Sequence, residues 1–244
     1  MNNWDVNKDT RFKEKVTHDI ISLAPNCCGN RVALMTSRTY TDLKELLSQK
    51  KIDSSSVIYN FDNLQGKGVI APTEMYDGET MEEAFERLWT KETNALFAEN
   101  GMTAPAHKLI FDDILKFNWR TILKPDATFK FIYADTCNLP TPKFFDWLND
   151  KNTVNSVSMI GNLAFTVTFS HDTTIPLMES SEYADKQELL GGYKTGEKMM
   201  HYSKKLNGLI HMVEEGGNWK VVKAIHYDEF KGNSQMVTAI CQRA

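Results

Sequence analysis

The sequence lacks a long run of apolar residues. Its longest, LAFTV at residues 163–167, is far shorter than the roughly 20 residues that a membrane-spanning helix needs. The N-terminal stretch MNNWDVNKDTRFKEK is polar and has no apolar core of the kind that a secretory signal carries. We therefore expect a cytoplasmic protein with no membrane partner.

Cysteine is scarce, with four among 244 residues: Cys27, Cys28, Cys137 and Cys241. None lies in the C-x-x-C spacing of a zinc knuckle, and no histidine is close in sequence to Cys137 or Cys241, so we expect no metal site. The cytosol favours reduced thiols, and we expect all four to be free.

Positive charge is also in short supply. The 28 lysines and arginines face 32 aspartates and glutamates, which gives a net charge of −4. No overall positive field attracts a polyanion, although the composition is compatible with a local basic patch, so nucleic acid is a possible substrate and not an implied one. Internal repeats and the G-x-x-x-x-G-K and G-x-G-x-x-G phosphate loops are absent, which disfavours solenoids and other nucleotide-binding enzymes.

What is present is a globular composition, with 41% hydrophobic and 25% charged residues. At 244 residues the chain is long enough to bury a core without metals or crosslinks. We expect one domain over residues 1–244, in which residues 1–20 form an N-terminal extension.

Short apolar runs alternate with amphipathic stretches, which predicts alternating strands and helices. Residues 31–37 and 55–62 have strand character, and TYTDLKELLSQKK between them has leucines at helical spacing behind Thr41 as a candidate N-cap. This βαβ unit should have parallel strands. Further strands are expected at residues 107–111, 129–135 and 162–170.

Helices are expected between and after these strands. They cover residues 77–100, 114–123, 139–150 and, with an interruption at Gly191 and Gly192, 183–215. The chain closes with two strands, at residues 218–230 and 234–243, joined by the turn-forming KGN. Two adjacent strands with such a turn predict an antiparallel hairpin.

Five βα units followed by a closing hairpin resemble the class I S-adenosylmethionine-dependent methyltransferases. In that family the last strand inserts antiparallel into an otherwise parallel sheet, whereas a dinucleotide dehydrogenase continues with another parallel strand. The resemblance covers nearly the whole chain after about residue 20. It implies a three-layer, Rossmann-like α/β fold with a mostly parallel seven-stranded sheet, and S-adenosylmethionine as a cofactor across the carboxyl ends of the strands.

The family has a glycine-rich turn after the first strand, which lets the backbone approach the methionine end of the cofactor. Here the turn is MTSRTYTD and has no glycine. The resemblance assigns Thr36 and Ser37 as hydrogen-bond donors to the cofactor carboxylate and Arg38 as its ion-pair partner. Alternatively, these side chains form an ordinary polar loop, or Arg38 or Tyr40 fills the cleft.

The resemblance assigns further cofactor contacts to the ends of the second and third strands. In YNFD, Asp62 suits the two ribose hydroxyls by its chemistry, whereas Asn60 suits the register. In FDDI, Asp113 would accept from the adenine amine and Ile114 would cover the ring. The alternatives are a turn cap for Asp62 and a helix cap for Asp113.

The fourth strand ends in YADTCNLPTP, where the family places its catalytic group. Asp135 would accept a proton or hydrogen bond from an amine or hydroxyl, and Asn138 would orient the amine. The segment loosely resembles the Asp/Asn-Pro-Pro-aromatic motif of amino-methylating enzymes and departs from it in sequence. Cys137 lacks the preceding proline of cytosine-C5 enzymes, so we expect a small buried residue. His171, after the fifth strand, is a further candidate base.

The leading hypothesis is a methyltransferase acting on an amine or hydroxyl, with a nucleic-acid base among the candidate acceptors. Methyl transfer needs mainly proximity, alignment and a freed lone pair, so one aspartate and a shaped pocket suffice. The alternative is a methyltransferase-like protein without cofactor that serves as a binding or regulatory subunit, which the glycine-free turn favours. The compact layout and divergent motifs also resemble proteins encoded by viruses of microbes.

Overall fold

The computed structural model describes residues 11–36, 40–62, 70–122, 129–138, 140–149, 160–169, 175–191, 196–228 and 235–244. Over these residues, strands and helices alternate and the chain closes with two strands, as the sequence predicts. The strands form a sheet in the order β3-β2-β1-β4-β5-β8-β7-β6. They are β1 (Arg31–Leu34), β2 (Val57–Phe61), β3 (Ala106–Ile110), β4 (Phe129–Asn138), β5 (Ile160–Phe169), β6 (Gln187–Leu190), β7 (Trp219–Asp228) and β8 (Gln235–Arg243).

The first five strands are parallel, and β8 lies between β5 and β7 and is antiparallel to both. Such an insertion of the last strand is what the resemblance to class I methyltransferases predicts. The chain therefore has the mostly parallel, Rossmann-like α/β fold of that class. The sheet described here has eight strands where seven were expected, and the additional one is β6, parallel to β7 at the edge.

The helix expected over residues 183–215 is wrong in its first part. Residues Ala184–Lys186 form the 3₁₀ helix η4 and residues Gln187–Leu190 form β6, so that α5 begins only at Gly196. The edge of β7 supplies backbone hydrogen-bond partners to this segment, and Lys223 of β7 pairs with Glu188 at 2.9 Å. Tertiary pairing has overridden a local helical pattern.

The helix expected over residues 114–123 is also wrong. The segment contains turns and the 3₁₀ helix η2 (Trp119–Thr121). The Asp113 carboxylate accepts from the Leu115 backbone N–H at 3.0 Å, a local bond that competes with helix formation. The Trp119 ring is fully buried against Phe61, with 5.1 Å between ring centroids, so packing fixes an irregular path.

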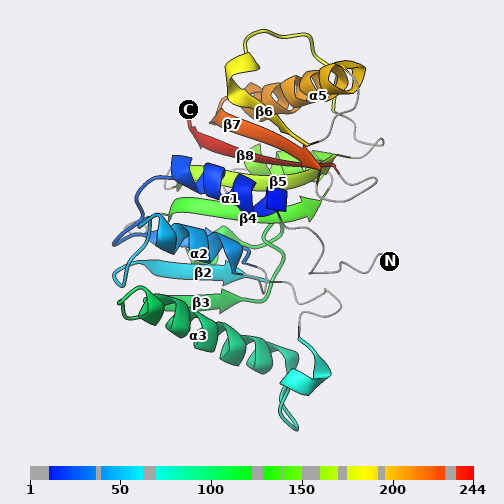
Figure 1. Cartoon of the computed structure of the whole chain (residues 1–244). Coiled ribbons are helices and arrows are strands. Elements are labelled where there is room, and N and C mark those ends of the chain that lie inside the picture. The colour runs from blue at the N-terminus through cyan, green and yellow to red at the C-terminus, as the bar shows by residue number, and fades with distance from the viewer. Residues whose placement is uncertain are drawn as a thin grey trace.

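Helices cover both faces of the sheet, so the fold has three layers (Figure 1). One face carries α1 (Arg11–Leu23), α2 (Thr41–Ser48) and α3 (Met81–Glu99), preceded by the 3₁₀ helix η1 (Pro72–Glu74). The other face carries α4 (Pro142–Asn149) and α5 (Gly196–Glu215). Each layer buries its own hydrophobic cluster against the sheet.

The start of α2 differs by one residue from the expectation. Thr41 is the first helical residue, and the N-cap is Tyr40, which adopts a left-handed conformation with φ of 53°. The Tyr40 side chain packs on Trp89 of α3, with 5.4 Å between ring centroids, and is 7% exposed. The residue that precedes α2 is thus packed against α3.

In the parts of the chain that the structure describes, no helix combines the length and apolar character needed to cross a bilayer. Cys27, Cys28 and Cys241 are free thiols. The side chain of Cys137 lies outside the described residues.

Candidate functional site

The carboxyl ends of β1, β2 and β4 lie next to one another at one edge of the sheet, because β1 lies between β2 and β4 and is parallel to both. In the register of the sheet, Leu34 of β1 lies beside Asn60 of β2 on one side and Tyr133 of β4 on the other. Thr36 follows β1, and Asp135 lies two residues beyond Tyr133. The fold thus brings together Thr36, Asn60 and Asp135, three of the residues that the sequence singled out.

Asn60 connects the ends of β1 and β2. Its side-chain Oδ1 accepts from the Thr36 backbone N–H at 2.8 Å, and the residue is fully buried. The Nδ2 group of Asn60 has no hydrogen-bond acceptor among the described residues, which is an uncommon state for a buried donor. Asn60 therefore has a structural role in fixing the turn, and it offers one unmet donor.

Asp42, in the first turn of α2, is an acidic residue that the sequence analysis missed. It is 6% exposed, and its carboxylate accepts from the Thr36 hydroxyl at 2.8 Å and from the Leu43 backbone N–H at 2.9 Å. Burial raises the pKa of Asp42 to about 6, against the effect of these two hydrogen bonds. The available signal was its spacing, because Asp42 lies four residues before the buried Leu46 on the same helical face.

Asp135 forms an ion pair with Lys13, from the first turn of α1. The Lys13 Nζ lies 2.7 Å from Asp135 Oδ2, and the two side chains are 25% and 12% exposed. Beside the pair is a hollow of about 10 Å³, which has room for about one water molecule at most. The hollow is lined by Lys13, Thr17, Met35, Thr41, Asp42, Tyr133 and Asp135.

A row of hydroxyl-bearing side chains lies on the strands next to Asp135. Asp135 is in register with Thr166 of β5, whose hydroxyl lies 2.9 Å from that of Thr238 in β8. The Tyr227 hydroxyl of β7 lies 3.3 Å from the Thr238 hydroxyl. Burial raises the pKa of Tyr227, and the Asp135 charge adds to this effect, so Tyr227 stays neutral beside the carboxylate.

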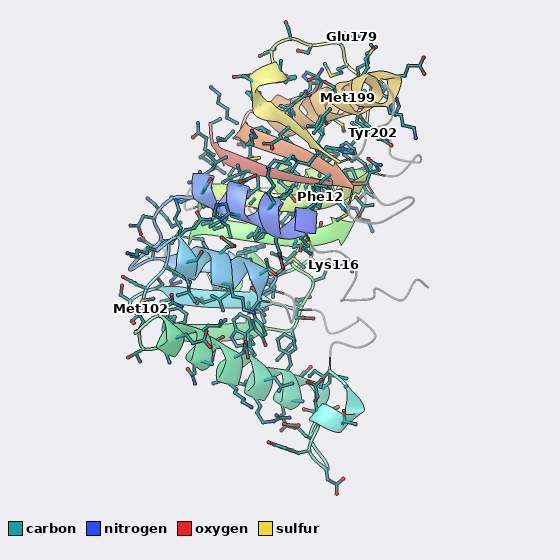
Figure 2. All side chains as sticks on the ribbon, viewed as in Figure 1. Phe12, Met102, Lys116, Glu179, Met199 and Tyr202 are labelled. Carbon is teal, nitrogen blue, oxygen red and sulfur yellow. The ribbon has the colours of Figure 1, made fainter. Side chains whose placement is uncertain are left out.

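Asp62 and Asp113 follow β2 and β3, which are neighbours in the sheet. The Asp62 backbone N–H donates to Ile110 O at 3.0 Å, which holds the ends of the two strands together. The side chain of Asp113 is 28% exposed and pairs with the exposed Lys116 (labelled in Figure 2) at 3.2 Å. The Asp113 carboxylate is therefore close to the surface, and Asp62 is half-buried.

Ile114 is fully buried in the core cluster under α4 and α5. The structure thus places it away from solvent, where it supports the turn after β3.

Four predicted residues have side chains outside the described part of the chain. Ser37, Arg38 and His171 lie outside the described residues. Asn138 ends β4, and only its backbone is described, paired in register with Val167.

The described residues fit the nucleoside end of an adenosyl cofactor in their chemistry. Carboxylates such as those of Asp62 and Asp113 accept hydrogen bonds from ribose hydroxyls and from an amine, and the unmet Asn60 Nδ2 is a donor near the same strand end. The side near Asp135 differs, because Lys13 occupies the space beside the carboxylate. The ends of β2 and β3 therefore suit a ligand better than the end of β4.

Comparisons with known proteins give similarity in structure only. No protein-family model matches the chain, and no curated protein sequence matches it. Among solved structures, a Burkholderia thailandensis 1,6-didemethyltoxoflavin-N1-methyltransferase, with 1,6-didemethyltoxoflavin and S-adenosylhomocysteine bound, is 9% identical. The similarity covers 96% of this chain and 78% of that one, with a TM-score of 0.47.

Two further solved structures are similar at the same level. TrmK of M. capricolum, in complex with S-adenosylhomocysteine, is 8% identical over 93% of this chain and 67% of its own, with a TM-score of 0.46. Trm5b from Pyrococcus abyssi is 10% identical over 94% of this chain and 48% of its own, with a TM-score of 0.45. The chain thus spans about half the length of Trm5b. Similarity at this level does not transfer an activity.

Proposed function

We propose that the protein is an S-adenosylmethionine-dependent methyltransferase acting on an amine or hydroxyl, over one domain of residues 1–244. The observation that carries the proposal is the strand order, with β8 antiparallel between β5 and β7, combined with carboxylates at the ends of β2, β3 and β4. Ligands of open α/β sheets bind at the carboxyl ends of strands, where these groups lie.

In this proposal Asp62 accepts hydrogen bonds from the ribose hydroxyls and Asp113 accepts from the adenine amine. Ser37 and Arg38 bind the cofactor carboxylate, while Thr36, which already bonds to Asp42, supports their turn. The cofactor supplies an electrophilic methyl group. The protein's own contribution is to hold the acceptor and to accept its proton at the Asp135 carboxylate, with Asn138 orienting an amine.

More than one class of acceptor is compatible with the proposed reaction. An adenine or cytosine amino group and a small-molecule amine are both acceptors whose lone pair becomes available once a proton is removed. The net charge of −4 gives no general attraction for nucleic acid, so a nucleic-acid acceptor would depend on local contacts.

A second candidate is a methyltransferase-like binding or regulatory protein. Two observations favour it, namely the glycine-free turn after β1 and the Lys13 side chain in the space beside Asp135. In that case neither S-adenosylmethionine nor its demethylated product would bind.

Calorimetric titration with S-adenosylhomocysteine separates the two candidates. Methyltransferase function predicts binding in the micromolar range, and Asp62→Ala should weaken it about tenfold or more because it removes a charged hydrogen-bond acceptor. Asp53→Ala is the matched control, since Asp53 precedes β2 at the opposite edge of the sheet. Asp135→Asn should bind as wild type does.

Absence of binding to the wild-type protein would overturn the methyltransferase proposal and favour the regulatory one. If Asp62→Ala and Asp53→Ala weaken S-adenosylhomocysteine binding equally, Asp62 is not part of the binding site.

A further inference from the structure

The first turn of α1, where Phe12 is labelled in Figure 2, reaches β4 near its carboxyl end, as the contact of Lys13 with Asp135 shows. Lys13, the next residue, forms the 2.7 Å ion pair with Asp135. Both side chains are largely shielded from water, so their interaction is screened less than that of an exposed surface pair. Lys13, which lies near the N-terminus in sequence, therefore supplies a positive charge at the carboxyl end of β4, where the proposed proton acceptor Asp135 lies.

The Asp42 carboxylate is a third charged group close to Lys13 and Asp135. Asp42 of α2 lines the same hollow as Lys13 and Asp135, and both of these charges act on it. One ammonium group thus faces two carboxylates, and the three charges come from α1, α2 and β4. Thr36, which follows β1, ties Asp42 to the end of the sheet through its hydroxyl.

We propose that Lys13 is a positioning residue for Asp135. We further propose that Lys13, Asp42 and Asp135 form one ionic unit, in which the protonation of each group depends on the other two and the net charge at the carboxyl end of β4 is set by all three. The proposal rests on the proposed function in one respect, namely that Asp135 is the proton acceptor. Lys13 holds the Asp135 carboxylate turned toward α1, and Asp42, at the same hollow, shares the Lys13 charge with Asp135.

The groups around Asp42 give the sign of the expected effects. Burial is the main cause of the raised pKa of Asp42; among the charges, Asp135 on β4 raises this pKa and Lys13 on α1 lowers it to a smaller extent. Tyr133, also on β4, is buried with a raised pKa and stays neutral. Removing the Lys13 cation should therefore move the protonation midpoint of Asp42 upward from about 6. Removing the Asp135 charge should move it downward.

The test is a ¹³C carboxyl NMR titration of the full chain without cofactor, in which Asp42→Asn identifies the Asp42 signal. Lys13→Met should raise the Asp42 midpoint, because the Lys13 charge favours the ionised form of the Asp42 carboxyl. Asp135→Asn should lower the midpoint, and Lys13→Arg should restore it. Lys15→Met is the matched control, because Lys15 lies on the same helix but pairs with Asp19 and Glu188.

A double-mutant cycle tests the pair itself. The unfolding equilibrium constants of Lys13→Met, Asp135→Asn and the double variant should depart from additivity by about tenfold, as for directly interacting charges. The cycle with Lys15→Met should show no coupling. An unchanged Asp42 midpoint in Lys13→Met, or an additive cycle, overturns the proposal.

Neither measurement depends on the cofactor. A shifted midpoint together with no S-adenosylhomocysteine binding would leave the ionic unit in place and overturn the proposed function. An unchanged midpoint together with S-adenosylhomocysteine binding would support the methyltransferase proposal and show that Lys13 does not position Asp135.

Discussion

Asp42 shows how burial of a single carboxylate alters the stability of the protein. Its side chain is shielded from water, and the two hydrogen bonds from Thr36 and Leu43 compensate only part of the cost of ionisation. The pKa therefore rises from an ordinary 3.8 to about 6. Between these pH values the unfolded chain has released its proton and the folded chain retains it, so the contribution of Asp42 to stability falls as pH rises.

Asp42→Asn should remove this pH dependence. Because each unit of pKa shift corresponds to about 1.4 kcal/mol, the free energy of unfolding of the variant relative to wild type should rise by about 3 kcal/mol between pH 4 and pH 7. Urea unfolding at these pH values measures the difference. A constant difference would contradict the prediction.

Asp53→Asn is the control for this experiment. Hydrogen bonds, chiefly from Ser55, lower the pKa of Asp53 below its ordinary 3.8. The stabilisation that Asp53 contributes is present above that value and is lost only as pH falls further, so the effect of Asp53→Asn should change little between pH 4 and pH 7.

At the scale of one element, α5 depends on a glycine where it crosses the preceding segment. A Cβ at Gly208 would overlap the Pro176 carbonyl oxygen, which is backbone and cannot rotate away. Asn207, the residue before it, donates to the carbonyl groups of Met178 at 2.9 Å and Ser180 at 3.1 Å. The helix is therefore held close to residues 176–180 by the Asn207 side chain, which hydrogen-bonds to their backbone.

Gly208→Ala should destabilise the protein by about 2 kcal/mol or more, because the helix must move away and lose these contacts. Gly196→Ala, at the first residue of the same helix, is the matched control. Nothing lies within 4 Å of a Cβ at Gly196, so its effect should stay within about 0.5 kcal/mol or be slightly stabilising. Thermal or urea unfolding measures the stability of both variants. Equal losses of stability would contradict the close approach of Gly208 to the Pro176 carbonyl.

At the scale of the whole molecule, the two faces of the sheet hold buried groups of opposite pH response. His226 of β7 is fully buried under α5 and stacks on Tyr202 at 4.5 Å between ring centroids. Burial, and then the Lys205 ammonium, lower the pKa of His226 to about 3. The unfolded histidine binds a proton below about pH 6.5 and the folded one does not, so this contribution to stability falls as pH falls.

His226→Phe should therefore gain about 3 kcal/mol relative to wild type as pH falls from 6.5 to 4, whereas Asp42→Asn loses a similar amount. In the double variant the two changes should largely cancel, because the groups lie on opposite faces and act independently. Urea unfolding across this pH range tests the cancellation. His201→Phe, on the exposed surface of α5, controls for the replacement of a histidine ring.

Much of the fold was predictable because it follows from local periodicity. Apolar runs at β1, β2 and β5 and the paired strands of β7 and β8 carry their own pattern, and so does α3, which begins after the capping box of Thr80 and Glu83. Within the candidate site, the sequence identified Thr36, Asn60 and Asp135 because each stands at or just beyond a strand end. The end of a strand can be located from the residues around it, so these three positions could be predicted without knowledge of the tertiary structure.

The sequence by itself determined the alternation of elements and the hairpin that closes the chain, since hydrophobic spacing and turn residues act between near neighbours. Only the tertiary structure decided that Gln187–Leu190 is a strand, that Asn60 faces inward, and that Lys13, Asp42 and Asp135 share one hollow. Each of these depends on groups from distant parts of the chain, and the energies of strand pairing and charge burial exist only once those parts are packed together.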